Sequence, residues 1–297
     1  ILLIQTFSSS LYGNMLRYII FKAFYSTYIM SHIYYYIFIK RRYGLRMPKK
    51  VWITGASSGI GKALAIKFAN EGWQVAASAR RENLLQDLNN NNSNIHSFPL
   101  DVKDESRAKK VFQDIVEKFQ TIDICVFCTG IHDPDAEKKL STEKIREIME
   151  TNFFGTLNCI MAVNSYFRER KNGHISIVSS VAAYRGLPAA SGYCASKSAL
   201  TSLAESLYFD FKRYNVRVSV ISPGFIKTPM TDKNKFPMPM IKSPEYAAEK
   251  IFVGLTKKNA FEIHFPKAFT IMMKLLKIIP NWLYFFIVGR GAKRIKL

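Results

Sequence analysis

The stretch that decides the fold covers residues 51–68 and reads V-W-I-T-G-A-S-S-G-I-G-K-A-L-A-I-K-F. It begins with a short apolar segment, Val51–Ile53, which predicts a buried strand. Three glycines follow in the order G-x-x-x-G-x-G, and apolar residues then recur at helical spacing. A glycine-rich turn between a first strand and a first helix lets backbone N–H groups approach a pyrophosphate closely. The stretch therefore predicts a dinucleotide-binding unit.

The rest of the chain repeats this alternation of strand and helix. The apolar segments predict further strands at 73–78, 95–100, 122–127, 174–179 and 217–221, with an edge strand at 261–265. Helical periodicity is found at 84–88, 106–119, 143–168, 189–214 and 247–255. This order predicts an α/β fold with a doubly wound parallel sheet of the Rossmann type. We expect one dinucleotide-binding catalytic domain at 47–265, a hydrophobic basic extension at 1–46 and an amphipathic tail at 266–297.

The positive charge is concentrated at the two ends of the chain. The formal net charge is +21 over 297 residues. Residues 1–50 hold eight Lys or Arg and no acid, and seven more Lys or Arg follow Glu262, again with no acid. This distribution argues against a nucleic-acid-binding body. It favours two basic, apolar ends that contact an anionic membrane surface.

Residues 1–46 allow two interpretations. Ala23 to Ile39 is an uncharged run of 17 residues, the lower limit for a membrane-spanning helix. Its tyrosines suit a membrane interface. One interpretation is a signal anchor with Lys40–Arg42 on the cytoplasmic side. In the other, Met47 is the natural start and residues 1–46 are absent from the mature protein.

The four cysteines do not form a disulfide framework. Cys125 and Cys128 stand three apart in an apolar segment, so on a strand their side chains point to opposite faces. Buried thiols are the better interpretation, and we expect no metal site. This cysteine usage suits a cytoplasmic protein, with membrane association through its ends.

The second predicted strand ends in Ala77-Ser78-Ala79-Arg80-Arg81. An acidic residue at this point would bind the ribose 2′-hydroxyl of NAD, whereas a guanidinium suits a 2′-phosphate. The sequence therefore favours NADP(H) without excluding NAD(H). The alternative is that the arginines are only solvated. Asp101-Val102, at the end of the third predicted strand, is placed to contact the adenine.

Tyr193 and Lys197 form the candidate catalytic pair. They are four residues apart, so a helix places them on one face, one turn from each other. A nearby cation favours the phenolate, so we expect the pKa of Tyr193 to fall from about 10 toward the range of a general acid/base. The alternative is a surface tyrosine and a solvated lysine.

Over roughly residues 47–265 the chain resembles the short-chain dehydrogenase/reductase family. The motifs are T-G-A-S-S-G-I-G at 54–61, L-D-V at 100–102, Asn152 in T-N-F-F-G-T, Ser180 thirteen residues before Tyr193, Y-C-A-S-K at 193–197 and P-G-F-I-K-T at 223–228. The resemblance implies hydride exchange between a nicotinamide and a carbonyl or hydroxyl substrate. One motif differs from the family pattern: the family usually has N-N-A-G after the fourth strand, and this chain has F-C-T-G at 127–130. Gly130 keeps the backbone turn, and we expect the bracing amide contacts to be lost.

The resemblance also implies roles for single residues. Tyr193 would be the general acid/base, and Lys197 would lower its pKa and hold the nicotinamide ribose. Ser180 would hydrogen-bond the substrate oxygen, and Asn152 would hold a water on the proton-relay path. The implied cofactor-binding residues are Gly55, Ser57, Ser58, Gly59, Ile60, Gly61, Arg80, Arg81, Asp101, Val102, Gly130, Tyr193, Lys197, Pro223, Gly224 and Thr228.

Two apolar segments suggest a lipophilic small-molecule substrate. The loop after Thr228 holds Met230, Phe236, Pro237, Met238, Pro239, Met240 and Ile241, which would make an adaptable lid. The alternative is packing on the core or a contact in a homodimer or homotetramer. In the tail, Pro280 separates two apolar runs. They suit an interfacial helix pair or a flap that completes the substrate pocket.

The sequence thus predicts an NADP(H)-dependent oxidoreductase that works as a reductase. Two alternatives remain open. One is a non-catalytic NADPH-binding sensor on the same fold, and the other is a membrane-bound interaction protein that uses the apolar ends.

Overall fold

The computed structural model describes residue 22, residues 48–258 and residues 260–294. The chain divides into two compact units, Ile1–Pro48 and Lys49–Leu297. The predicted anchor at 1–46 lies outside the described residues, residue 22 excepted. Within the described part of the chain, no helix is both long and apolar enough to cross a membrane.

The second unit is built on one seven-stranded sheet. The strands are β1 (Lys50–Thr54), β2 (Gln74–Ser78), β3 (Ile95–Ser97), β4 (Ile124–Phe127), β5 (Gly173–Val178), β6 (Val216–Pro223) and β7 (Glu262–Phe265). Their order is β3-β2-β1-β4-β5-β6-β7, and each neighbouring pair is parallel. Buried on both faces, the strands read as continuous apolar runs. The predicted fold class is confirmed, and β7 is the predicted edge strand.

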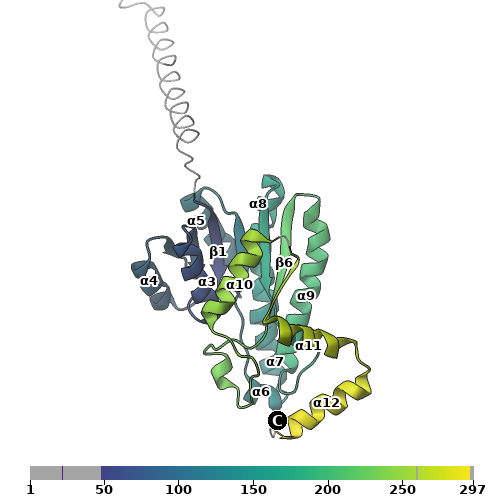
Figure 1. Ribbon diagram of the computed structural model, residues 1–297. Helices are drawn as coiled ribbons and strands as arrows, with labels where there is room; N and C mark the ends of the chain where they lie inside the picture. Colours follow the sequence, from purple (N-terminus) through teal and green to yellow (C-terminus); the bar gives the residue numbers. More distant parts are fainter. Residues whose placement is uncertain (1–21, 23–47, 259, 295–297) are drawn as a thin grey trace, which may run out of the picture. The chain divides into compact units, whose positions relative to one another are not determined.

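Helices cover both faces of this sheet (Figure 1). On one face α3 (Gly59–Asn70), α4 (Glu82–Asn91) and α10 (Pro244–Lys257) bury Phe68, Leu85 and Phe252 in one core. On the other face α5 (Glu105–Phe119), α8 (Gly155–Arg170) and α9 (Ser191–Lys212) bury Phe112, Phe167 and Leu200 in a second core. The sheet is therefore doubly wound.

The strand order changes direction between β1 and β4. From β1 the chain builds outward to β2 and β3, and it then returns to place β4 on the other side of β1. In open α/β sheets, ligands bind at the carboxyl ends of the strands at such a switch point. The glycine-rich turn between β1 and α3 lies at this point.

The predicted helix at 143–168 is interrupted. The chain instead forms α6 (Pro134–Lys138), α7 (Thr142–Met149), a π-helical turn at Glu150–Phe154, and then α8. The prediction of one continuous helix is wrong at this turn. A π-turn adds one residue to the helical repeat and is often found at functional sites. Here it carries the buried Asn152.

Two C-terminal helices, α11 (Lys267–Ile278) and α12 (Asn281–Arg294), are separated at Pro280 as predicted. Arg185, in the segment after β5, donates hydrogen bonds to the carbonyl oxygens of Leu276 (2.7 Å) and Ile279 (2.8 Å). Its guanidinium also lies 4.1 Å from the ring centroid of Tyr284, whose hydroxyl donates to the Gly186 carbonyl. These contacts attach α11 and α12 to the segment 184–187.

Candidate active site

The glycine-rich turn brings backbone close to backbone. Gly55 has a φ of +70°, a left-handed conformation that favours glycine. A Cβ atom on Gly61 would overlap the carbonyl of Gly55. The first turn of α3 therefore packs directly on the end of β1, with no side chain between them. The first-turn N–H groups of α3, which lack intrahelical partners, lie next to this turn, and such a helix N-terminus suits a phosphate.

Arg81 reaches back from the end of β2 to this turn. Its guanidinium donates hydrogen bonds to Ser57 Oγ at 2.9 Å and to Ser58 Oγ at 2.7 Å. Arg80 and Arg81 are both exposed, and both line the cavity described below. Among the ion pairs of the described residues, neither arginine has a carboxylate partner. Their charge is available to an anion next to the turn.

Tyr193 and Lys197 lie in the first two turns of α9. The ammonium of Lys197 is buried and donates to the carbonyl of Val178, at the end of β5, at 2.9 Å. It lies 5.7 Å from the ring centroid of Tyr193. Burial lowers the pKa of Lys197 to about 8.

Burial shifts the pKa of Tyr193 in the opposite direction. Loss of solvation raises the pKa of Tyr193 to about 12, and a hydrogen bond with Ser180 only partly opposes this rise. The prediction of a lowered Tyr193 pKa is wrong, because burial penalises the phenolate more than its neighbours stabilise it. At neutral pH Tyr193 therefore keeps its proton.

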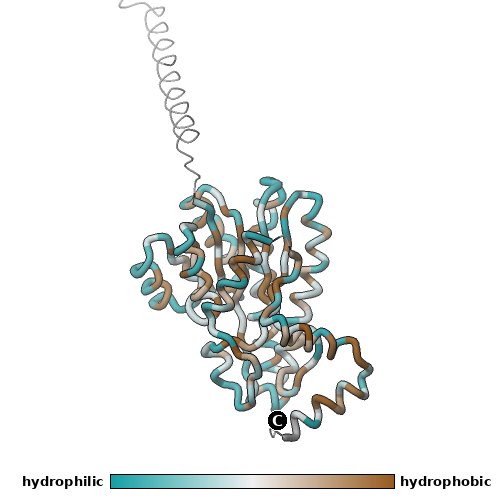
Figure 2. The backbone as a smooth tube through the Cα atoms, viewed as in Figure 1, coloured by the Kyte–Doolittle hydropathy of each residue, from teal (hydrophilic) through white to brown (hydrophobic). Residues whose placement is uncertain are grey.

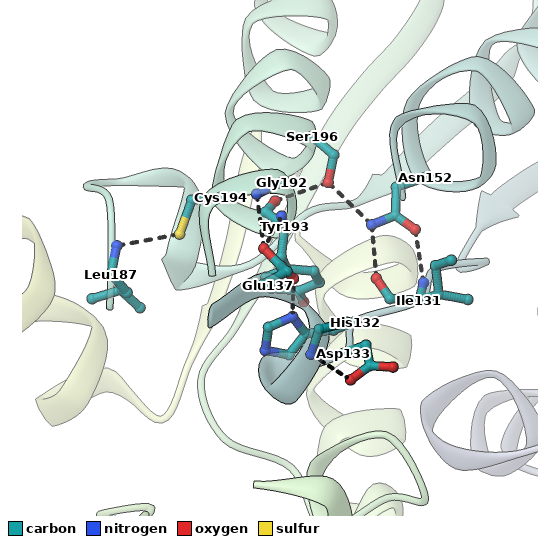
Figure 3. Close-up of polar contacts among 11 residues, drawn as sticks. Ile131, His132, Asp133, Glu137, Asn152, Leu187, Gly192, Tyr193, Cys194 and Ser196 are labelled. Atoms are coloured by element: carbon teal, nitrogen blue, oxygen red, sulfur yellow. Dashed lines mark hydrogen bonds and ion pairs between the residues drawn. The ribbon is translucent and has the colours of Figure 1, made fainter. Parts of the chain in front are cut away.

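Asn152 braces two parts of the site. Its side-chain oxygen accepts from the Ile131 amide at 2.7 Å, and its nitrogen donates to the Ile131 carbonyl at 3.0 Å and to Ser196 Oγ at 3.0 Å (Figure 3). Ser196 Oγ in turn donates to the Tyr193 carbonyl at 2.8 Å. Asn152 thus links the loop after β4 to the helix that carries Tyr193. It braces the loop where the sequence departs from the family pattern, while its water-holding role stays a prediction.

A cavity of about 650 Å³ brings the predicted site together. Ser180, Tyr193, Lys197 and every predicted cofactor-binding residue line it, whereas Asn152 is fully buried behind the wall. Thr228 closes over the glycine-rich turn, since a Cβ on Gly59 would lie 3.0 Å from Thr228 Cγ2. The cavity runs without interruption from Arg81 to Tyr193.

Two residues that the sequence analysis did not single out lie beside Tyr193. His132 lines the cavity, and its ring centroid is 4.6 Å from that of Tyr193. Glu137 is buried and bonds both His132 and the amide of Tyr193 (Figure 3). Glu137 stands in the polar run D-P-D-A-E-K-K at 133–139, which reads as a solvated surface. The sequence carries no signal that joins Glu137 to a residue 56 positions later.

Fewer residues of the predicted apolar lid line the cavity than expected. Of its seven residues, Met230 lines the cavity, whereas Phe236 packs against Phe225 at a centroid distance of 6.0 Å. Met240 and Ile241 are exposed. Among the described residues of α11 and α12, none lines this cavity.

Cys125 lies within β4 and Cys128 directly follows this strand, and the two differ in exposure. Cys125 is buried and Cys128 is partly buried at the cavity wall. Burial raises the pKa of the Cys128 thiol to about 11. Across the part of the chain that the structure describes, no group of three or more His, Cys, Asp or Glu side chains could hold a metal ion.

The chain is similar to known oxidoreductases. Residues 49–239 match the family model described as short chain dehydrogenase. An uncharacterized oxidoreductase from Myxococcus xanthus is 34% identical over 236 residues, covering 78% of this chain and 93% of the relative. The 3-oxoacyl-[acyl-carrier-protein] reductase FabG from Thermotoga maritima is 32% identical over 232 residues, covering 73% of this chain and 94% of the relative. The structure of ElxO with NADP bound is similar with a TM-score of 0.65 and 26% identity, covering 73% of this chain and 96% of that one. The chain therefore belongs to the short-chain dehydrogenase/reductase family and is an oxidoreductase that interconverts a carbonyl and a hydroxyl.

Proposed function

We propose that this protein is an NADP(H)-dependent reductase of lipophilic carbonyl compounds. The observation that carries the proposal is the single cavity in which Arg81, at the phosphate turn, and the Ser180, Tyr193 and Lys197 side chains all lie. The protonation state of Tyr193 suits the reductive direction. Because its pKa is raised to about 12, the phenol holds a proton at neutral pH, as a proton donor in reduction must.

The residues at one end of the cavity fit NADP(H). The turn that Gly55 and Gly61 form leaves room for a pyrophosphate against bare backbone. The guanidinium of Arg81, without a carboxylate partner among the described residues, suits a 2′-phosphate. The structure of ElxO with NADP bound, to which the chain is similar, supports the same preference.

Four side chains of the site each have a separate role in the reaction. When bound, the nicotinamide supplies the hydride that reduces the carbonyl carbon. Tyr193 donates its proton to the carbonyl oxygen, and Ser180 donates a hydrogen bond that stabilises the developing alkoxide. Lys197 holds a positive charge beside them and binds the ribose hydroxyls. Asn152 links the loop after β4 to the start of α9 and holds a water on the relay path.

The proposal is tested by NADPH and NADH oxidation, measured side by side with 2-decanone, acetophenone and a 3-oxodecanoyl thioester. We expect turnover with NADPH on at least one of these probes and kcat/KM at least about tenfold lower with NADH. Tight NADPH binding without turnover on any carbonyl would instead support the sensor.

We also propose that α11 and α12 contact an anionic membrane surface, from which the enzyme takes its substrate. Hydrophobic residues gather along these two helices (Figure 2). Several of their side chains are exposed, among them Ile278 (77% exposed), Trp282 (70%) and Phe285 (65%). Lys277 and Arg290 are exposed beside them, and no acid follows Glu262 in the sequence. An apolar face flanked by cations is the composition of an interfacial helix.

The test is co-sedimentation with vesicles of phosphatidylcholine alone or of equimolar phosphatidylcholine and phosphatidylserine. We expect binding to the anionic vesicles, and we expect Trp282→Ser with Phe285→Ser to abolish it. Phe209→Ser is the matched control, because Phe209 is 73% exposed but lies on α9. Equal sedimentation with both vesicle types, or a stable dimer that the double variant dissociates, would refute the membrane contact.

A further inference from the structure

A fully buried carboxylate next to the proton donor has no part in the mechanism above. We propose that Glu137 and His132 are positioning residues for Tyr193: the Glu137 carboxylate fixes the backbone of Tyr193 and also the imidazole that packs on its ring. The inference rests on the proposed function in one respect, namely that Tyr193 is the proton donor.

Glu137 caps the helix that carries Tyr193. Its side chain has no exposed surface, and one carboxylate oxygen accepts from the amides of Gly192 (2.7 Å) and Tyr193 (3.1 Å). These amides belong to the first turn of α9, where helices leave N–H groups without intrahelical partners. The residue at the helix boundary, Ala190, supplies no side-chain cap. A negative charge here is also favourable to the helix dipole.

The other carboxylate oxygen holds His132. It lies 2.7 Å from Nδ1 of the imidazole, so a carboxylate at this distance directs the Nδ1 proton toward itself. The ring then packs on Tyr193, with centroids 4.6 Å apart and planes tilted by 37°. The Glu137 carboxylate therefore holds both the backbone amide of Tyr193 and the imidazole that packs against the Tyr193 ring (Figure 3).

The surroundings leave this arrangement little room to adjust. A Cβ on Gly192 would lie 3.3 Å from Ile145 Cγ1, so α9 begins tightly against α7. On the other side, Ser196 is held by Asn152. Without the Glu137 hydrogen bonds, the amides of Gly192 and Tyr193 need another acceptor, and the start of α9 should shift relative to Ser180. A displacement of about 1 Å can cost roughly 100-fold in rate.

The experiment compares Glu137→Leu, Glu137→Gln and His132→Ala with Asp135→Asn as the matched control. Asp135 lies on the same short helix, but it is exposed, and its ion-pair partner among the described residues is Lys235. Glutamine keeps an oxygen for the two amides and can donate to His132 Nδ1, so it should restore most of the function that leucine loses. Each variant is measured for kcat and KM with the fastest carbonyl probe, for NADPH affinity by fluorescence, and for its unfolding midpoint.

We expect Glu137→Leu and His132→Ala to lower kcat roughly 10- to 100-fold. KM and NADPH affinity should stay within about threefold, and Glu137→Gln and Asp135→Asn should stay near the parent enzyme. A kcat unchanged in Glu137→Leu and His132→Ala, or losses shared equally by kcat, KM and NADPH binding, would overturn the proposal. If Glu137→Leu does not fold, His132→Ala decides alone.

A second measurement does not depend on turnover. Hydrogen exchange, followed by mass spectrometry of the peptide spanning residues 190–197, reports on the amides that Glu137 caps. Exchange should be at least about tenfold faster in Glu137→Leu than in Glu137→Gln, because the capped amides then have no acceptor. Equal exchange in these two variants would show that Glu137 does not hold the start of α9, even if no probe is turned over.

Discussion

Replacement of Arg81 by alanine should separate the two nicotinamide cofactors. The Arg81 guanidinium donates to Ser57 and Ser58 and has no carboxylate partner among the described residues, so its charge can face a 2′-phosphate. A hydrogen bond to a charged group contributes about 1.5–3 kcal/mol. At tenfold per 1.4 kcal/mol, Arg81→Ala should raise the KM for NADPH by about 10- to 100-fold. The KM for NADH, which lacks the phosphate, should change by less than about threefold.

Arg80 and a lysine substitution provide the controls. Arg80 is exposed and makes no side-chain hydrogen bond with the serines of the turn, so Arg80→Ala should cost less than Arg81→Ala. Arg81→Lys keeps the charge but loses the planar fork, and it should fall between alanine and the parent enzyme. The assay is initial-rate NADPH and NADH oxidation with a fixed carbonyl. Equal losses for the two cofactors would refute the reasoning, because Arg81 would then serve only to hold the turn.

The remaining predictions concern the proton donor, its pH dependence and the C-terminal helices. Tyr193→Phe should abolish detectable reduction while NADPH affinity, measured by fluorescence, stays within about twofold; retained turnover would contradict the assigned role. Because burial lowers the pKa of Lys197 to about 8 and raises that of Tyr193 to about 12, the reduction rate should be constant below pH 8 and should fall above it as Lys197 loses its charge. A pH–rate profile flat to pH 10 would argue against a required Lys197 cation. Arg185→Ala should remove the contacts with α11 and Tyr284 and speed hydrogen exchange in α12 by at least about tenfold, and unchanged exchange would mean that other contacts suffice.

Local patterns account for most of the fold and for the composition of the cavity. The continuous apolar runs and the glycine-rich turn predicted the parallel sheet, and the strand ends placed Arg81 and Asp101 on the cavity that holds Tyr193. The π-turn at Asn152 was not predictable. It adds one residue to a helix whose apolar periodicity continues on either side, so the hydrophobic pattern does not record it.

Properties that depend on tertiary surroundings could not be predicted from the sequence. The four-residue spacing correctly placed Tyr193 and Lys197 on one helix, but the direction of the Tyr193 pKa shift depends on burial, which spacing does not encode. The contact of Glu137 with the start of α9 joins residues more than fifty positions apart, and no local motif marks it. Arg185, which contributes to the attachment of the tail, likewise reads as an ordinary charged loop residue.

The contacts of Arg185 bear on how this enzyme can be recombined with its relatives. The carbonyl groups at the end of α11 are satisfied by a side chain located some ninety residues earlier, in the segment that leads from Ser180 to α9. The tail and the 184–187 segment are therefore matched to each other through Arg185. A chimera that exchanges only the tail would place the helices of a relative against a loop that was not selected to bind them. Exchange of both segments together would keep the contacts between the loop and the end of α11.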